Sequence, residues 1–237
     1  MEIVPMYLKK FEHKTDIFFD LDHTLWDFEK NSALAFEQVL HEMKLPFTIE
    51  QFLNYYVSIN AEYWDRYSLN QISQAELRIG RIRDTFNSLD YTTSVDRMLE
   101  VGDRYLSYLP DYNHLFDGAI EILEYLQEKY KLHIITNGFD QVQARKIKNS
   151  GMEGYFQTIT NSELAGVKKP DAKIFTYALQ LAKAQVQDTV MIGDNLLADI
   201  EGAQNIGMDV IYYNEHYKTV PTTLPQVNTL LDIKSLL

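Results

Sequence analysis

The spacing of hydrophobic residues divides the chain into two kinds of segment. From about residue 116 onward, short apolar runs alternate with stretches whose apolar residues recur at helical spacing. The pattern predicts strands over 133–135, 156–159, 190–192 and 210–212. Helices are expected over 118–130, from after Gly138 to about 149, around Ile174, Phe175, Ala178 and Leu181, and over 197–206. An earlier run, residues 17–19, has the same strand character. Strands and helices that alternate in this way are typical of a parallel sheet covered on both faces.

Residues 27–107 have a different pattern, with helical spacing throughout and no alternation with strands. The residues expected to begin these helices are Asn31 or Ser32, Thr48 with Gln51, Ser73 with Glu76, and Ser94. The sequence therefore predicts an α/β protein: a Rossmann-like parallel sheet core formed by residues 1–26 and 108–237, with an α-helical cap, residues 27–107, inserted after the first strand.

Composition narrows the classes of function. The 237 residues are 46% hydrophobic, which is enough for a well-buried core, and the formal net charge of −12 argues against a nucleic-acid-binding face or a basic membrane surface. The chain has no cysteine, which excludes disulfides, thiolate catalysis and cysteine-based zinc sites. Residues 1–14 lack the apolar centre of a signal peptide. We expect a cytoplasmic protein that binds neither a nucleic-acid polymer nor a membrane.

Four polar segments follow the predicted strands. They are Asp20-Leu21-Asp22, Thr136-Asn137-Gly138, Lys168-Lys169-Pro170, and Gly193-Asp194 with Asp199. Each is a common turn when taken alone. Because the loops at the carboxyl ends of parallel strands converge on one crevice, we expect the four segments to form one site.

The residue types in these segments are those that phosphoryl transfer needs. Asp20 can attack phosphorus, which gives an aspartyl-phosphate, and Asp22 can serve as the general acid and base. Thr136, with the backbone N–H groups of Asn137 and Gly138, can hold phosphoryl oxygens.

The chain also offers candidate residues to balance the negative charge of the phosphoryl group. A lysine of the Lys168-Lys169-Pro170 turn can neutralise the nucleophile and the phosphoryl group. Asp194 and Asp199 can join Asp20 and Asp22 in a site for Mg²⁺, which prefers oxygen ligands.

Together the four segments resemble the four motifs of the haloacid dehalogenase superfamily of phosphohydrolases. The resemblance covers essentially the whole chain, and the helical insertion resembles that superfamily's first type of cap. It implies that Asp20 is the nucleophile, Asp22 the acid and base, Thr136 a phosphate ligand and Asp194 a metal ligand. It also implies that Lys169 is the charge-neutralising lysine, because the family's lysine directly precedes the proline.

A finer resemblance concerns the substrate. The run Thr24 to Phe28, the segment Ile135 to Phe139 and the cap pattern are similar to bacterial 5′-nucleotidases that act on non-standard pyrimidine nucleotides. This resemblance implies substrate contacts from Asn60, Trp64 and Arg81. Aromatic residues at helical spacing, such as Trp64 and Tyr67, are more often core residues, and an arginine such as Arg81 is more often at the surface. The chain departs from many relatives at Asp117-Gly118, where they carry Pro-Gly. We expect a Mg²⁺-dependent 5′-nucleotidase acting on a small phosphorylated metabolite, a pyrimidine nucleoside monophosphate.

Three alternatives stay open at this point. A sugar-phosphate or other small-metabolite phosphatase, or a phosphomutase, would use the same four motifs. A carbon–halogen hydrolase is disfavoured by Asp22, since halide displacement needs no acid for the leaving group. A non-catalytic binding module would have no physical need for the carboxylates and the lysine.

Overall fold

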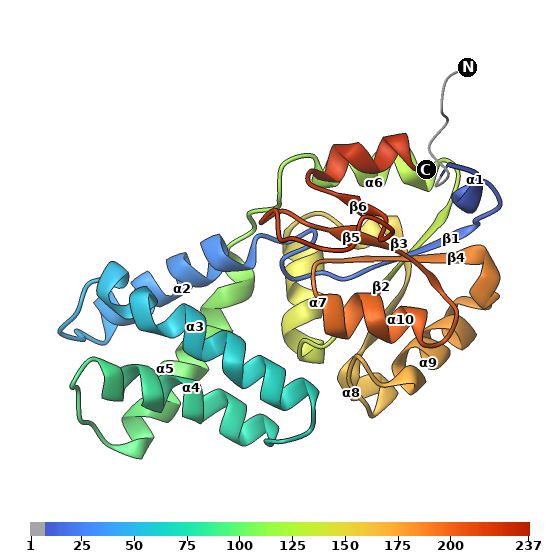
Figure 1. The fold of residues 1–237 in the computed structure, drawn as a ribbon. Coiled ribbons are helices and arrows are strands. Elements are labelled where there is room, and N and C mark those ends of the chain that lie inside the picture. Colours follow the sequence, from blue (N-terminus) through green and yellow to red (C-terminus); the bar gives the residue numbers. More distant parts are fainter. Residues whose placement is uncertain (1–7) are drawn as a thin grey trace. The chain divides into compact units, whose positions relative to one another are not determined.

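The computed structural model describes residues 8–237 and contains two compact units (Figure 1). One unit combines the chain up to Asp27 with residues 114–237, and the other is residues 28–113. The first unit is an α/β core and the second is entirely helical. No helix in residues 8–237 is both long and apolar enough to cross a bilayer.

The core is built on a six-stranded sheet in which all neighbouring strands are parallel, in the order β3-β2-β1-β4-β5-β6. The strands are β1 (Asp16–Phe19), β2 (Lys131–Thr136), β3 (Phe156–Asn161), β4 (Thr189–Gly193), β5 (Asp209–Tyr213) and β6 (Gln226–Val227). The chain runs outward from β1 to β3 and then returns to β4 beside β1. This reversal of strand order is where open α/β sheets form their binding crevice.

Helices cover both faces of the sheet, as the hydrophobic pattern predicts. They are α1 (Leu8–Phe11), α6 (Ala119–Gln127), α7 (Asp140–Asn149), α8 (Ser162–Ala165), α9 (Ala172–Ala182) and α10 (Gly202–Gln204), with 3₁₀ turns η2 (Glu153–Tyr155), η3 (Val186–Asp188) and η5 (Leu230–Ser235). In Figure 1, α6 and η5 lie on one side of the sheet and α9 and α10 on the other. Strand side chains alternate between faces, so Phe18, Met191 and Val210 pack in one cluster with Ile174 and Phe175 of α9.

One segment of the core differs from its predicted form. The helix expected over 197–206 begins as a π-helical turn, η4 (Leu196–Glu201), and continues as α10. A π-helical turn occurs mostly as a single turn near functional sites. Here it contains Asp199, whose side chain points back toward the end of β4.

A cluster of buried polar side chains lies in the amino-terminal halves of β1, β2 and β3. His133 of β2 lies 3.0 Å from Asp16 Oδ1 and 2.8 Å from the Thr158 hydroxyl, and its ring stacks on Phe18. Burial is the largest influence on this imidazole and lowers its pKa, although Asp16 opposes that shift.

The helical unit contains α2 (Phe28–Glu42), α3 (Ile49–Ser68), α4 (Gln74–Ser88), α5 (Val95–Tyr108) and the 3₁₀ turn η1 (Leu109–Asp111). The predicted caps Thr48 and Ser73 are confirmed, and Ser94, the predicted start of the next helix, is also a cap, because each side chain accepts a hydrogen bond from the third residue of its helix. Aromatic rings fill the interior, where Phe36 stacks on Tyr105 with ring centres 4.0 Å apart.

Two sequence-based boundaries differ from the structure. The first helix begins at Phe28, so Asn31 and Ser32 do not cap it; both are buried, and the Ser32 hydroxyl hydrogen-bonds the hydroxyl of Tyr105. The helical unit also extends to Asn113 instead of ending at residue 107. It does so because η1 packs against α2 and α5.

Candidate active site

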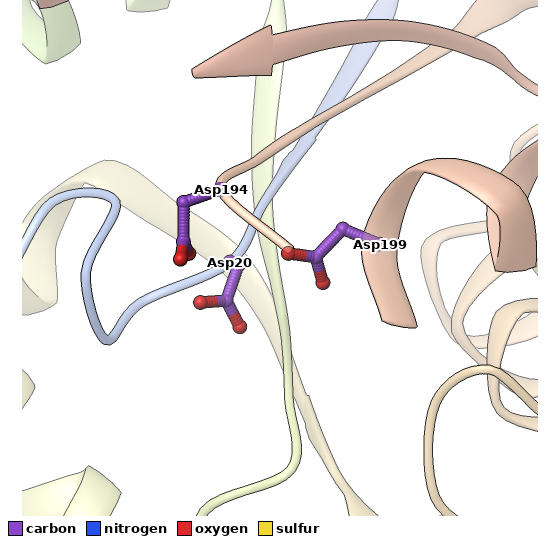
Figure 2. A group of neighbouring side chains, drawn as sticks. All are labelled: Asp20, Asp194 and Asp199. Carbon is purple, nitrogen blue, oxygen red and sulfur yellow. The ribbon is translucent and has the colours of Figure 1, made fainter. Parts of the chain in front are cut away.

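Three carboxylates meet at the carboxyl ends of β1 and β4. Asp20 follows β1, Asp194 follows β4, and Asp199 lies in η4. Each residue offers one oxygen, and these oxygens all lie within 4.8 Å of one another. Figure 2 shows the three side chains converging from these separate segments. The parallel pairing of β1 with β4 is what brings them together, since it aligns Phe19 with Ile192.

The backbone after β4 is shaped to hold Asp199. A Cβ atom at Gly193 would lie 2.4 Å from Asp199 Oδ2, so only glycine leaves room for that carboxylate. The backbone N–H of Asn195 donates to the same oxygen at 3.0 Å, and the Asn195 side chain caps the turn by accepting from Leu197 and Ala198. The sequence Gly-Asp-Asn therefore closes the strand and fixes a carboxylate four residues later.

Lys169 is the cation of the cluster. Its side chain is only 2% exposed, and its Nζ lies 2.5 Å from Asp20 Oδ1 and 2.6 Å from Asp199 Oδ1. It also donates to the carbonyl oxygen of Ile135 at 2.7 Å. The ammonium thus donates hydrogen bonds to Asp20 and to the Ile135 carbonyl, and its contact with Asp199 Oδ1 is an ion pair without a hydrogen bond. The turn preceding α9 consequently carries its lysine to the same point as the two aspartates.

The cluster holds more negative than positive charge. Burial raises the pKa of Asp20 well above its usual value, and Lys169 opposes that shift. Burial, followed by the charge of Asp199, raises the pKa of Asp194 to about 7. Burial alone would lower the pKa of Lys169, but Asp199 and Asp20 reverse the shift and raise it. The cluster sets one ammonium against three carboxylates, of which Asp20 and Asp199 are buried and Asp194 is partly exposed, so a further cation would balance the charge.

The donor set fits Mg²⁺, which takes carboxylate oxygens together with waters. The structure brings together three of the four predicted metal residues, Asp20, Asp194 and Asp199. The carboxylate of Asp22 lies outside this group. It instead accepts hydrogen bonds from Gln143 at 2.9 Å and Lys146 at 2.6 Å. The hydroxyl of Thr24 supports the group by donating to Asp194 Oδ1 at 3.0 Å.

Thr136 ends β2 beside this cluster, as the sequence predicts for a phosphate ligand. Its hydroxyl oxygen accepts from the backbone N–H of Gly138 at 3.1 Å and from the side-chain amide of Gln143 at 2.7 Å. Because both bonds use the oxygen as acceptor, the hydroxyl hydrogen is available for donation to an anion. A Cβ at Gly138 would lie 2.4 Å from the Gln143 side chain, which explains the glycine at this position.

The side chain of Asn137 makes contacts that the sequence does not predict, since the expectation for phosphate binding concerned its backbone N–H. Its side-chain amide donates to the backbone carbonyl of Lys169 at 2.9 Å and accepts from the backbone N–H of Lys169 at 2.8 Å. This two-sided contact resembles the pairing of two strands. The side chain of Asn137 therefore holds the loop that carries the lysine.

Two polar residues beside Asp22 were missed by the sequence analysis. Gln143 and Lys146 lie one turn apart on the buried face of α7, and both contact Asp22. Their spacing of three was the available signal, since it places two long polar side chains on one face of the helix that follows Thr-Asn-Gly. Polar residues on a buried face need partners, and here the partner is a predicted catalytic carboxylate.

The predicted substrate residues of the helical unit fall into two environments. Asn60 and Arg81 are buried, and Arg81 Nη1 donates to Asn60 Oδ1 at 2.7 Å. The guanidinium carbon of Arg81 lies 5.4 Å from the ring centre of Tyr105, and its Nε is buried with no hydrogen-bond partner among residues 8–237. Trp64 is partly exposed and packs edge-on against Tyr67.

Comparison with known proteins places this arrangement in context. The family described as haloacid dehalogenase-like hydrolases matches residues 17–213. Pyrimidine 5′-nucleotidase PynA of Streptococcus pneumoniae is 34% identical over 203 residues, which are 85% of this chain and 84% of that protein. Glyceraldehyde 3-phosphate phosphatase of Pyrococcus abyssi is 31% identical over 201 residues, which are 83% and 80% of the two chains.

A solved structure supports the fold. The crystal structure of the putative hydrolase YfnB of Bacillus subtilis, described as bound to magnesium, superposes with a TM-score of 0.85. It is 27% identical, and the superposition covers 94% of this chain and 97% of YfnB.

Proposed function

Because the chain belongs to the haloacid dehalogenase-like hydrolases, we propose that it is a magnesium-dependent phosphomonoesterase acting on pyrimidine nucleoside 5′-monophosphates. The observation that carries the phosphatase assignment is the contact of Lys169 with Asp20 and Asp199, next to Asp194. A buried ammonium beside a carboxylate nucleophile lowers the electrostatic cost of bringing an anionic phosphate to it.

The chemistry divides into two steps at Asp20. A carboxylate oxygen of Asp20 forms a bond to phosphorus while the ester P–O bond breaks, and Asp22 gives its proton to the leaving oxygen. Asp22 then takes a proton from a water whose oxygen attacks phosphorus. The bond between Asp20 and phosphorus breaks, and inorganic phosphate is released. Thr136 donates its hydroxyl hydrogen to the phosphoryl group.

The metal would be held by Asp20, Asp194 and Asp199. When bound, Mg²⁺ would supply positive charge for the phosphoryl oxygens. The observation that supports this assignment is the excess of carboxylates over ammonium groups in the cluster.

Base recognition in this proposal rests on the helical unit. Arg81 and Asn60 are buried and hydrogen-bond each other, so in this proposal they hold the interior of the helical unit in place. Trp64, which is partly exposed, would stack on the ring of a pyrimidine base. The identity with PynA favours this substrate class. A sugar phosphate is the second candidate, favoured by the comparable identity with the glyceraldehyde 3-phosphate phosphatase.

The test is phosphate release from pyrimidine and purine monophosphates and from sugar phosphates, with and without Mg²⁺. The wild type should release phosphate only with Mg²⁺ and prefer pyrimidine nucleotides, and Asp20→Asn should abolish release. Arg81→Met should raise KM for nucleotides, whereas the control Arg78→Met, at an exposed ion pair with Asp103, should not. A preference for sugar phosphates would overturn the nucleotide assignment alone. Undiminished release by Asp20→Asn would overturn the mechanism.

A further inference from the structure

The contacts of α7 with Asp22 have a use that the proposed mechanism does not assign. Lys146 Nζ lies 2.6 Å from Asp22 Oδ1, and Gln143 Nε2 lies 2.9 Å from Asp22 Oδ2. The two oxygens of the carboxylate therefore each have their own donor. Both donors come from a single helix, which begins four residues after the end of β2.

Lys146 is fixed in place. Its side chain is 2% exposed, and its ammonium lies 4.1 Å from the ring centre of Trp26. A lysine normally extends its charge to solvent, and burying that charge is costly unless an opposite charge or an aromatic face compensates it. Here Asp22 and Trp26 do so together. The compensation depends on the side chain of Asp22 remaining where it is.

Gln143 joins Asp22 to the phosphate ligand. The side-chain nitrogen of Gln143 donates one hydrogen to Asp22 and the other, at 2.7 Å, to the hydroxyl oxygen of Thr136. Both hydrogens of the amide are thus used. Its carbonyl oxygen is buried and has no hydrogen-bond partner within residues 8–237. An unpaired buried acceptor is destabilising. The orientation of this amide is thus set by its two acceptors, Asp22 and Thr136, at the expense of its own oxygen.

We propose that Gln143 and Lys146 are positioning residues for Asp22, holding its carboxyl group in register with Thr136 for proton transfer to the leaving oxygen; the proton is carried on a lone pair of Asp22 that neither donor occupies. This inference rests on the proposed function, because it requires Asp22 to be the general acid. Neither residue touches the substrate in this scheme. Both act through Asp22, and Gln143 also fixes the distance between the acid and the phosphate ligand.

The proposal predicts a dependence on the leaving group. A nucleoside 5′-oxygen is a poor leaving group and needs a proton, whereas p-nitrophenolate leaves without one. Displacing Asp22 should therefore slow the hydrolysis of a nucleoside monophosphate and spare that of p-nitrophenyl phosphate. A general loss of structure would slow both reactions. The quantity kcat/KM is the right one to compare, because it reports the steps up to the first irreversible one, in which the leaving group departs.

The experiment measures kcat/KM for both substrates in the wild type, Asp22→Asn, Lys146→Met and Gln143→Met. The two α7 variants should lose about 10²-fold with the nucleotide, the size expected for a misplaced catalytic group, and less than about 3-fold with p-nitrophenyl phosphate. The exposed residues Lys148 and Gln141 of the same helix provide matched controls, and their methionine variants should behave as the wild type. Thermal unfolding of each variant establishes that it is folded.

A double variant makes the test decisive. In the Asp22→Asn background, adding Lys146→Met should cost no more than about 2-fold, because residues that act through one group are not additive. Equal losses with both substrates, or an additive double variant, would overturn the inference and leave the phosphatase assignment intact. If the wild type hydrolyses neither substrate in the presence of Mg²⁺, the proposed function itself is refuted. A Lys146→Met protein that does not fold leaves Gln143→Met to decide.

Discussion

Replacing Lys169 with methionine gives the sharpest test of the buried charge cluster. Methionine keeps most of the apolar stem but removes the ammonium that lies 2.5 Å from Asp20 and 2.6 Å from Asp199. The carbonyl of Ile135 loses its donor as well. Removing one partner of a buried ion pair costs about 3–5 kcal/mol, because the other charge stays buried without compensation.

That cost can be converted into a measurable shift. In a domain of this size, 1 kcal/mol changes Tm by about 2–4 °C, so Lys169→Met should lower Tm by roughly 6–20 °C in EDTA at pH 8. The loss should be smaller at pH 5. Burial already raises the pKa of Asp20 while Lys169 opposes that shift, so without the lysine the carboxyl group binds a proton more readily and sheds its charge.

The assay must report on the core unit. The sequence contains two tryptophans, Trp26 in the core and Trp64 in the helical unit. In a Trp64→Phe background, urea unfolding followed by fluorescence therefore follows Trp26 alone. Lys173→Met, at an exposed position on α9, is the matched control and should change stability by less than about 0.5 kcal/mol.

A second substitution separates charge from packing. Asp199→Asn added to Lys169→Met removes one of the uncompensated carboxylates, so the double variant should be more stable than Lys169→Met alone. If Lys169→Met unfolds within about 1 kcal/mol of the wild type, or if Asp199→Asn destabilises it further, the reasoning about the cluster is refuted.

Three further predictions follow from local geometry. Gly193→Ala should weaken Mg²⁺ binding in calorimetry at least tenfold, because its Cβ would lie 2.4 Å from Asp199 Oδ2, whereas Gly154→Ala, with open space around it, should bind as the wild type does. The rise in Tm on adding Mg²⁺ should be larger at pH 8 than at pH 5, since burial raises the pKa of Asp194 from 3.8 to about 7 and its ionisation destabilises the metal-free protein over that range; a pH-independent rise would contradict this. Because burial lowers the pKa of His133 from 6.5, the unfolded chain binds a proton more readily, and the wild type should lose stability as pH falls from 7 to 5 relative to His133→Gln in urea unfolding; a constant difference between the two proteins would exclude it.

The sequence predicts the architecture well because periodicity is a local property. Short apolar runs such as residues 17–19 and 190–192 have few alternatives to a buried strand, and the order of strands and helices leaves few topologies. The convergence of Asp20, Asp194 and Lys169 follows from that topology alone. Choosing Lys169 over Lys168 needed the family resemblance, and the structure places Lys169 in the cluster.

What the sequence leaves undetermined depends on side-chain direction. Asn31 and Ser32 look like helix caps in one dimension, but the helix begins at Phe28 and buries both. Asp22 follows Asp20 by two residues, yet its carboxylate contacts α7 and lies outside the group of three carboxylates. Asn137 contacts a loop about thirty residues away in the chain. No spacing rule encodes such contacts, because they depend on the packing of one element against another.

The pairing of β1 with β4 has a consequence for how the protein folds. The ligands contributed by these strands are more than 170 residues apart in sequence, and the whole helical unit lies between them. Contacts between distant residues form slowly, since closing a long loop costs entropy before any pairing compensates it. The carboxylate cluster therefore cannot exist until the central strands have joined. Binding of a divalent cation during refolding would thus report when the strands of the core have paired. We expect cation binding to appear after the helical unit has acquired its secondary structure.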